Sequence, residues 1–234
     1  MTNERPENVW ATTLPNGLRV RVLCKPDFQR SYAVFATCYG GADRRFRVGD
    51  TWTDTPAGVA HYLEHKMFDM PDGDNALSVL SANGAQPNAF TSSGMTAYFF
   101  DCTSGFEENL RMLLKFVSTP YFTQETVDKE QGIIGQEICM VEDNPGYVVY
   151  NRLMRMLYEF NPIRDQVAGS IESIAEITAE TETVMAIITA YLNVSRRHRV
   201  VLTELSRSRK TPARETVRKM IEIIRLADTA RVQK

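Results

Sequence analysis

Residues 58–65 read Gly-Val-Ala-His-Tyr-Leu-Glu-His, a stretch that places two histidines and a glutamate close together in the sequence. His61 and His65 are four positions apart, so on a helix both imidazoles lie on one face within reach of a single cation. Glu64 lies on the same face, beside the pair. This HxxEH order is typical of a site in which the imidazoles bind zinc and the carboxylate acts as a general base. The alternative is a solvated helix face, or two core histidines that form hydrogen bonds.

A catalytic zinc ion needs a third protein ligand, and the chain offers two candidate carboxylates. Glu130 and Glu137 are seven positions apart, which is two turns of a helix predicted to begin after Thr123 and to end near Val141. Both carboxylates therefore project from one helix face. One of them could bind zinc, and the other could orient a ligand from behind.

The segments around the histidine pair alternate between strand-like and helix-like patterns. Asn16-Gly17 lies between two apolar runs and predicts a tight hairpin. Strands are expected at 18–23, 32–39, 89–91, 96–100 and 198–205. Helices are expected at 55–68, 75–82, 106–118, 124–141, 148–158, from 178 to about 190, and 212–227. Because strands and helices interleave without strict βαβ alternation, the predicted fold class is α+β, in a single domain.

The size and composition fit a globular domain. With 234 residues, 43% hydrophobic and 24% charged, the chain is neither disordered nor fibrous in type. No apolar run reaches 18 residues and no signal-peptide core is present, so we expect no membrane span and no secretory signal. Four cysteines without CxxC spacing are interpreted as thiols in a reducing compartment: Cys24, Cys38, Cys102 and Cys139. We therefore expect a cytoplasmic protein.

The charge is unevenly distributed along the chain. Residues 193–234 hold 12 Lys and Arg against 4 Asp and Glu, whereas the net charge of the whole chain is −2. A basic tail could contact nucleic acid, but no aromatic residue interleaves these arginines to stack on bases. We interpret the tail as a helix with a solvated basic face, and expect neither a nucleic-acid partner nor a membrane.

These motifs resemble those of the pitrilysin or insulinase family of zinc metallopeptidases, which are inverzincins, and are similar to bacterial relatives of the mitochondrial processing peptidase β subunit. The resemblance rests on residues 58–65 and on Glu130 to Glu137. Support comes from the Asn16-Gly17-Leu18 hairpin, from Asn88-Ala89-Phe90-Thr91 followed by Thr96-Ala97-Tyr98, and from Pro120-Tyr121-Phe122. It covers residues 10–178 closely and 179–234 loosely. It implies one N-terminal half-domain over residues 1–234, with helices packed on a mixed, largely antiparallel sheet.

The resemblance assigns the roles at the metal site residue by residue. His61, His65 and Glu137 match the zinc ligands of the family, and Glu64 matches its catalytic base. Glu130 matches an acidic residue that supports the site from behind the ligands. The implied cofactor is Zn²⁺.

The resemblance also implies where substrate binds. Asn88, Ala89, Phe90 and Thr91 fall on an edge strand that, in the family, pairs with the substrate backbone by β-augmentation. The implied activity is endopeptidase cleavage of peptides or small unfolded proteins. Because the chain corresponds to about one half-domain, we expect self-association or pairing with a separate homologous half-domain.

Two other interpretations stay open. One is a half-domain that binds zinc and peptide without catalysis and that needs, or regulates, a partner chain. The other is the S-ribosylhomocysteine lyase fold, which shares HxxEH and takes a cysteine as third ligand, with Cys102 as the candidate.

Overall fold

The computed structural model describes residues 9–25, 28–48, 50–181 and 199–204, and its centre is a six-stranded sheet with the order β1-β2-β8-β3-β7-β6. The strands are β1 (Val9–Thr13), β2 (Arg19–Cys24), β3 (Ser31–Thr37), β6 (Ala85–Thr91), β7 (Thr96–Cys102) and β8 (Arg199–Glu204). Neighbours pair antiparallel except β2 and β8, which pair parallel. The predicted α+β class with a mixed, largely antiparallel sheet is confirmed.

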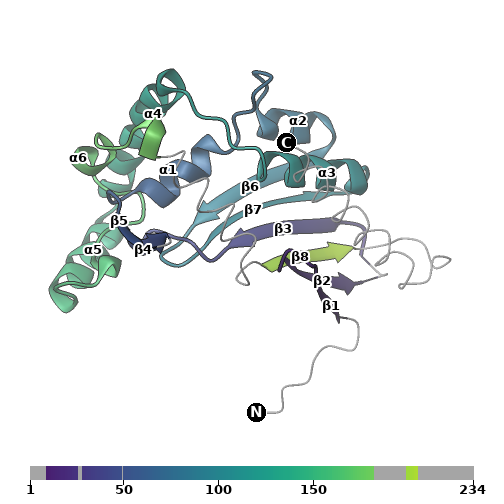
Figure 1. The fold of residues 1–234 in the computed structure, drawn as a ribbon, viewed down its shortest axis with the longest axis horizontal. Helices are drawn as coiled ribbons and strands as arrows, with labels where there is room; N and C mark the ends of the chain where they lie inside the picture. The colour runs from purple at the N-terminus through teal and green to yellow at the C-terminus, as the bar shows by residue number, and fades with distance from the viewer. Residues whose placement is uncertain (1–8, 26–27, 49, 182–198, 205–234) are drawn as a thin grey trace, which may run out of the picture.

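The helices are α1 (Val59–Lys66), α2 (Ala76–Ala82), α3 (Phe106–Phe116), α4 (Gln124–Glu142), α5 (Pro145–Leu157) and α6 (Ile171–Ile174), with a 3-10 turn, η1 (Pro162–Arg164). Of these, α1, α2 and α3 cover one face of the sheet, whereas α5 extends away from it (Figure 1). The core lies between the helices and the sheet, where apolar side chains from both layers are buried. The inner face predicted for 106–118 is confirmed, since Leu110, Leu113, Leu114 and Val117 are all buried. No helix in the described ranges is long and apolar enough to cross a membrane.

The predicted hairpin at the start of the chain joins β1 to β2. The Leu14 N–H donates to the Leu18 carbonyl at 2.8 Å, and Gly17 has a φ of 89°. That left-handed conformation costs glycine little, because glycine has no Cβ. The Asn-Gly pair therefore sets the turn and the register of the first two strands.

One hairpin was not predicted, and because of it the first helix begins later in the sequence than expected. β4 (Arg45–Val48) and β5 (Thr51–Asp54) form a separate two-stranded sheet, and α1 begins at Val59 rather than near Thr55. The Thr55 N–H bonds to the Arg44 carbonyl at 2.8 Å, which continues the hairpin instead of starting a helix. Gly58, with a φ of 99°, is the N-cap at which the helix can begin. The prediction of a helix from residue 55 was wrong for this reason.

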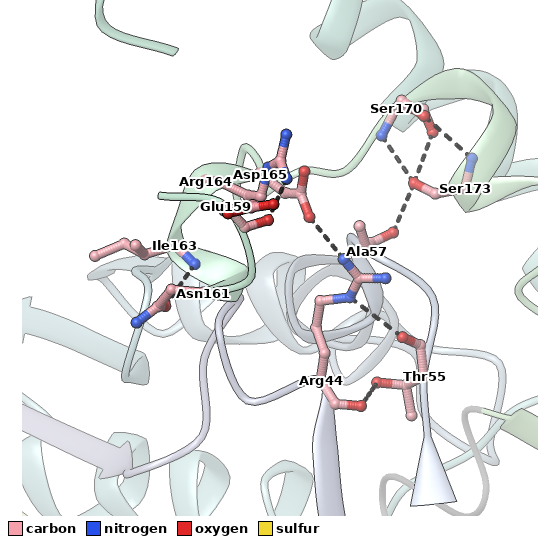
Figure 2. Close-up of polar contacts among 10 residues, drawn as sticks. All are labelled: Arg44, Thr55, Ala57, Glu159, Asn161, Ile163, Arg164, Asp165, Ser170 and Ser173. Atoms are coloured by element: carbon pink, nitrogen blue, oxygen red, sulfur yellow. Dashed lines mark hydrogen bonds and ion pairs between the residues drawn. The ribbon is translucent and has the colours of Figure 1, made fainter. Parts of the chain in front are cut away.

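The start of α1 is fixed by a segment more than a hundred residues away (Figure 2). Arg44 donates to the Asp165 carboxylate at 2.6 Å, and the Ser173 hydroxyl donates to the Ala57 carbonyl at 2.8 Å. The backbones approach closely here, because a Cβ on Gly169 would lie 2.5 Å from the Ala57 oxygen. Contacts between distant segments thus determine where the histidine-bearing helix starts.

The later predictions are met in part. The cap at Thr123 is present on α4, whereas α5 begins at Pro145, three residues before the predicted start, because the Asn144 side chain caps it. The predicted strand 198–205 is present as β8, between β2 and β3. The predicted helix 212–227 and most of the helix through residue 190 lie outside the described residues.

Candidate metal centre

The two predicted halves of the site lie on adjacent helices, α1 and α4. The Tyr62 hydroxyl of α1 is buried and donates to the backbone carbonyl of Val127 in the first turn of α4. Val127, Ile134 and Ile138 bury one face of α4 in the core. This packing fixes the position of α4 relative to α1, and with it the carboxylates that α4 carries.

Three potential metal ligands converge between these helices. Ligand atoms of His61, His65 and Glu137 all lie within 4.8 Å of one another. His61 Nε2 is 3.6 Å from Glu137 Oε1, and His65 Nε2 is 3.5 Å from Glu137 Oε2. In a tetrahedral zinc site with bonds of about 2.0–2.1 Å, ligand atoms lie roughly 3.3–3.4 Å apart. The donor types and their separations therefore fit a zinc ion.

Glu130 contacts His65 at Nδ1, the ring nitrogen that does not face Glu137. Its Oε1 is 2.9 Å from His65 Nδ1, so it can hold the proton on that nitrogen and leave Nε2 as the donor atom toward a metal. Within the described part of the chain, the buried Nδ1 of His61 has no such hydrogen-bond partner. Of the two carboxylates on α4, Glu137 lies among the candidate ligand atoms, and Glu130 contacts His65 at Nδ1.

The electrostatics of the cluster favour positive charge. Burial alone would lower the pKa of His65, but its hydrogen bond with Glu130 and the negative charges of Glu130, Glu137 and Glu64 together raise it. The contact with the His61 imidazole lowers the pKa of the Glu137 carboxyl, against the opposite effect of burial. With neutral imidazoles, the cluster presents carboxylates around two nitrogen donors, an arrangement suited to a divalent cation.

Glu64 lies beside the ligands and has a different partner. It is only 7% exposed, and its Oε2 accepts a hydrogen bond of 2.5 Å from the Thr91 hydroxyl. Glu64 is absent from the converging ligand atoms. A buried carboxylate next to a metal site, but outside the ligand set, is positioned to exchange protons with a substrate or water there.

The predicted substrate residues lie on β6, an edge strand of the sheet. Among the described strands, β6 pairs only with β7. Asn88 and Phe90 are exposed, whereas Ala89 and Thr91 are half-buried. A pocket of about 560 Å³ lies beside this strand, and Glu64, His65, Asn88 and Ala89 contribute to its wall. An extended peptide could therefore pair with β6 and pass the candidate metal site.

Two features of the site were not predicted from the sequence. Tyr62 ties α1 to α4, although its place in the motif gave no sign of a polar role. Tyr147 of α5 is half-buried, and burial is the main cause that raises its pKa, with smaller effects of Tyr150 and Glu137. Neither feature could be predicted from the sequence, because each depends on which helices contact one another in the folded protein.

The alternative third ligand is not at the site. Cys102 is buried at the end of β7, paired with Ala85 and Ser31, and its thiol contacts Asn109 of α3. Among the described residues, the ligand cluster contains Glu137 and no cysteine. The proposal of Cys102 as a metal ligand was wrong. The end of β7 near the candidate site is Thr96, which pairs with Thr91, the partner of Glu64, whereas Cys102 lies at the other end of the strand.

The chain matches known proteins over this region. The family model described as insulinase (peptidase family M16) matches residues 51–171. An uncharacterized zinc protease of Bacillus subtilis is 47% identical over 176 residues, which is 74% of this chain and 41% of that relative. A probable mitochondrial-processing peptidase subunit beta of Arabidopsis thaliana is 27% identical over 173 residues, covering 72% of this chain and 31% of its own length.

Solved structures show the same fold. The crystal structure of an M16-like peptidase from Alicyclobacillus acidocaldarius matches with a TM-score of 0.84 and 34% identity, over 95% of this chain and 51% of that one. A peptidase M16 inactive domain from Pseudomonas fluorescens shares the fold, with a TM-score of 0.75, 16% identity and coverage of 95% and 50%. The chain thus spans about half the length of these structures and about two-fifths of the Bacillus relative.

Proposed function

The chain belongs to the insulinase family of peptidases (family M16), and from that premise we propose that it is a zinc-dependent endopeptidase half-domain acting on peptides or small unfolded proteins. The observation that carries the proposal is the convergence of His61, His65 and Glu137, with Glu64 buried beside them. Metal binding alone does not require Glu64, whereas peptide hydrolysis requires a general base.

In this proposal His61 and His65 of α1 and Glu137 of α4 hold the zinc ion, and Glu130 orients His65. Bound zinc would polarise the attacking water and the scissile carbonyl. Glu64 would accept a proton from the water as the water oxygen bonds to the carbonyl carbon. It would return that proton to the amine nitrogen as the C–N bond breaks.

β6 would position the substrate for this reaction. Main-chain hydrogen bonds along Asn88–Thr91 would hold an extended peptide in register, while the neighbouring pocket receives a side chain. Main-chain pairing is tolerant of sequence, so the proposed substrates are defined by an extended backbone rather than by one motif.

We also propose that residues 1–234 act as one half of a larger assembly, paired with a homologous half-domain or a second copy of this chain. Support comes from the relatives, which are about twice as long as the region they share with this chain. The second candidate function is a half-domain that binds zinc and peptide without catalysis. The neighbour described as an inactive domain favours it, and the presence of Glu64 opposes it.

A quenched fluorescent peptide library tests the proposal. The purified chain is supplied with one equivalent of zinc and assayed alone and over a range of its own concentrations. We expect zinc-dependent cleavage that 1,10-phenanthroline removes and fresh zinc restores. One bound zinc per chain without any cleavage, at every concentration, would favour the binding role and refute catalysis by this chain alone or by pairs of its copies.

A further inference from the structure

We infer that Thr91 is the positioning residue for Glu64, and that its hydroxyl holds one carboxylate oxygen so that the other oxygen handles the proton. This inference rests on the proposed function, since it assigns a task within that reaction. It gives the side chain of Thr91 a role separate from the main-chain pairing expected of β6.

The contact itself is short and shielded from water. The Thr91 hydroxyl lies 2.5 Å from Glu64 Oε2, and the Glu64 side chain is almost fully buried. Hydrogen bonds to a carboxylate are shorter and stronger than those between neutral groups, and burial strengthens them further. A carboxylate held in this way has little freedom to rotate about its last torsion.

The neighbouring hydroxyl determines the direction of the bond. The buried Thr96 hydroxyl donates to the Tyr39 carbonyl at 2.9 Å, which uses its single proton. Thr96 Oγ1 lies 3.3 Å from Thr91 Oγ1 and is left only to accept. The Thr91 hydroxyl therefore donates its proton to Glu64 Oε2, which is closer than Thr96 Oγ1 and carries negative charge. Oε2 is then occupied as an acceptor, and Oε1 is the oxygen that remains to take the proton.

The backbone around Thr91 is held in place by strand pairing and by contact with a neighbouring loop. Thr91 is the last residue of β6 and pairs with Thr96 across the turn to β7. The turn is fastened to the loop after β3, because the Gly41 N–H donates to the Ser92 carbonyl at 2.9 Å. A Cβ on Gly40 would lie 2.4 Å from that same oxygen, so the two loops are in tight contact. The donor is therefore presented from a rigid support.

Three variants separate positioning from folding. Thr91→Val keeps the size and shape of the side chain and removes the donor, and Thr91→Ser keeps the donor. Thr37→Val is the matched control, since Thr37 is a buried strand threonine opposite Thr96. The Thr37 hydroxyl has no hydrogen-bond partner among the residues that the structure describes. None of the three changes alters the edge-strand backbone that would pair with substrate.

Steady-state kinetics of the zinc-loaded chain gives the first readout. We expect Thr91→Val to lower kcat about tenfold to a hundredfold with KM within about twofold, as for lost orientation of a reacting group. Thr91→Ser should stay within about threefold of wild type, and Thr37→Val should match it. Equal kcat values for Thr91→Val and wild type would overturn the inference. A zinc-loaded wild type that cleaves nothing would overturn the proposed function, and this inference with it.

A double-mutant cycle on the zinc-free chain gives a readout that needs no activity. Urea unfolding is measured for wild type, Thr91→Val, Glu64→Ala and the double variant. We expect the two changes to couple by about tenfold in the folding equilibrium constant, as for a buried hydrogen bond to a charged group. Additive effects would show that the contact does not constrain Glu64 and would overturn the inference even if the enzyme is active.

Discussion

Two consecutive helices, α4 and α5, are both amphipathic, yet they relate to the rest of the protein in opposite ways. α4 buries Val127, Ile134 and Ile138 in the core, whereas α5 buries no residue at all. Most of the apolar side chains of α5 are exposed, as is Phe160 after it, and the exposed fraction reaches 85% for Met156 and 86% for Phe160. In Figure 1, α4 lies beside α1, and α5 extends away from the sheet.

The core of this chain holds the candidate metal ligands in place without help from α5. Glu130 and Glu137 are carried by the helix that the core holds, so the ligand geometry does not depend on α5. An exposed apolar patch such as the α5 face is typical of an interaction surface. The candidate chemistry and the candidate association surface are therefore separable, and substitutions on one should leave the other intact.

The largest expected effect tests the chemistry on the buried side of this comparison. Glu64→Gln removes the general base and leaves His61, His65 and Glu137 unchanged. We expect kcat to fall by at least about a thousandfold while one zinc per chain is retained. The peptide assay measures the fall in kcat, and metal analysis of the dialysed variant measures the retained zinc. Loss of zinc in this variant would place Glu64 among the ligands and contradict the assignment.

The next effect concerns the packing that fixes α4. Ile138→Ala removes a side chain that is 1% exposed on the helix that carries Glu137. Core truncations of this size cost about 2–5 kcal/mol in the free energy of unfolding. Urea denaturation of the zinc-free chain measures this loss. A cost below about 1 kcal/mol would mean that α4 is no better anchored than α5, and the comparison would fail.

A smaller effect tests the support behind the ligands. Glu130→Gln keeps the shape of the side chain but weakens its hold on His65 Nδ1. Loss of such a partner costs about tenfold to a hundredfold in metal affinity. Competition with a chromogenic zinc chelator measures that affinity, and Glu125→Gln, on the exposed first turn of α4, is the control. Equal zinc affinity in Glu130→Gln and wild type would remove Glu130 from the site.

Local sequence signals predicted much of this arrangement. The Asn16-Gly17 turn and the Thr123 cap both lie where short-range rules place them. The HxxEH spacing and the Glu130–Glu137 spacing likewise indicated which faces of α1 and α4 carry polar groups. These features succeed because each depends on residues within two helical turns of one another.

The features that escaped prediction depend on distant parts of the chain. The true start of α1 is set by Gly58, where a Cβ would lie 2.6 Å from the carbonyl oxygen of Ala168. The bond from Thr91 to Glu64 joins residues 27 positions apart and exists only once β6 lies beside α1. The insertion of β8 between β2 and β3 likewise has no local signal. The roles of individual side chains at the site therefore needed the fold.

The smallest expected effect completes the comparison and uses a matched pair. Leu153→Ala on α5 removes the same number of carbon atoms as Ile138→Ala on α4, but Leu153 is 49% exposed. Truncation of a side chain already in contact with water opens no cavity, and alanine favours the helix, so we expect a stability change within about 0.5 kcal/mol. Zinc affinity should be unchanged, because no ligand lies on α5. If the α5 face is an association surface, light scattering at rising concentration should show less self-association for Leu153→Ala than for wild type. A loss of 2 kcal/mol or more in the monomer would instead mean that α5 packs against part of this chain.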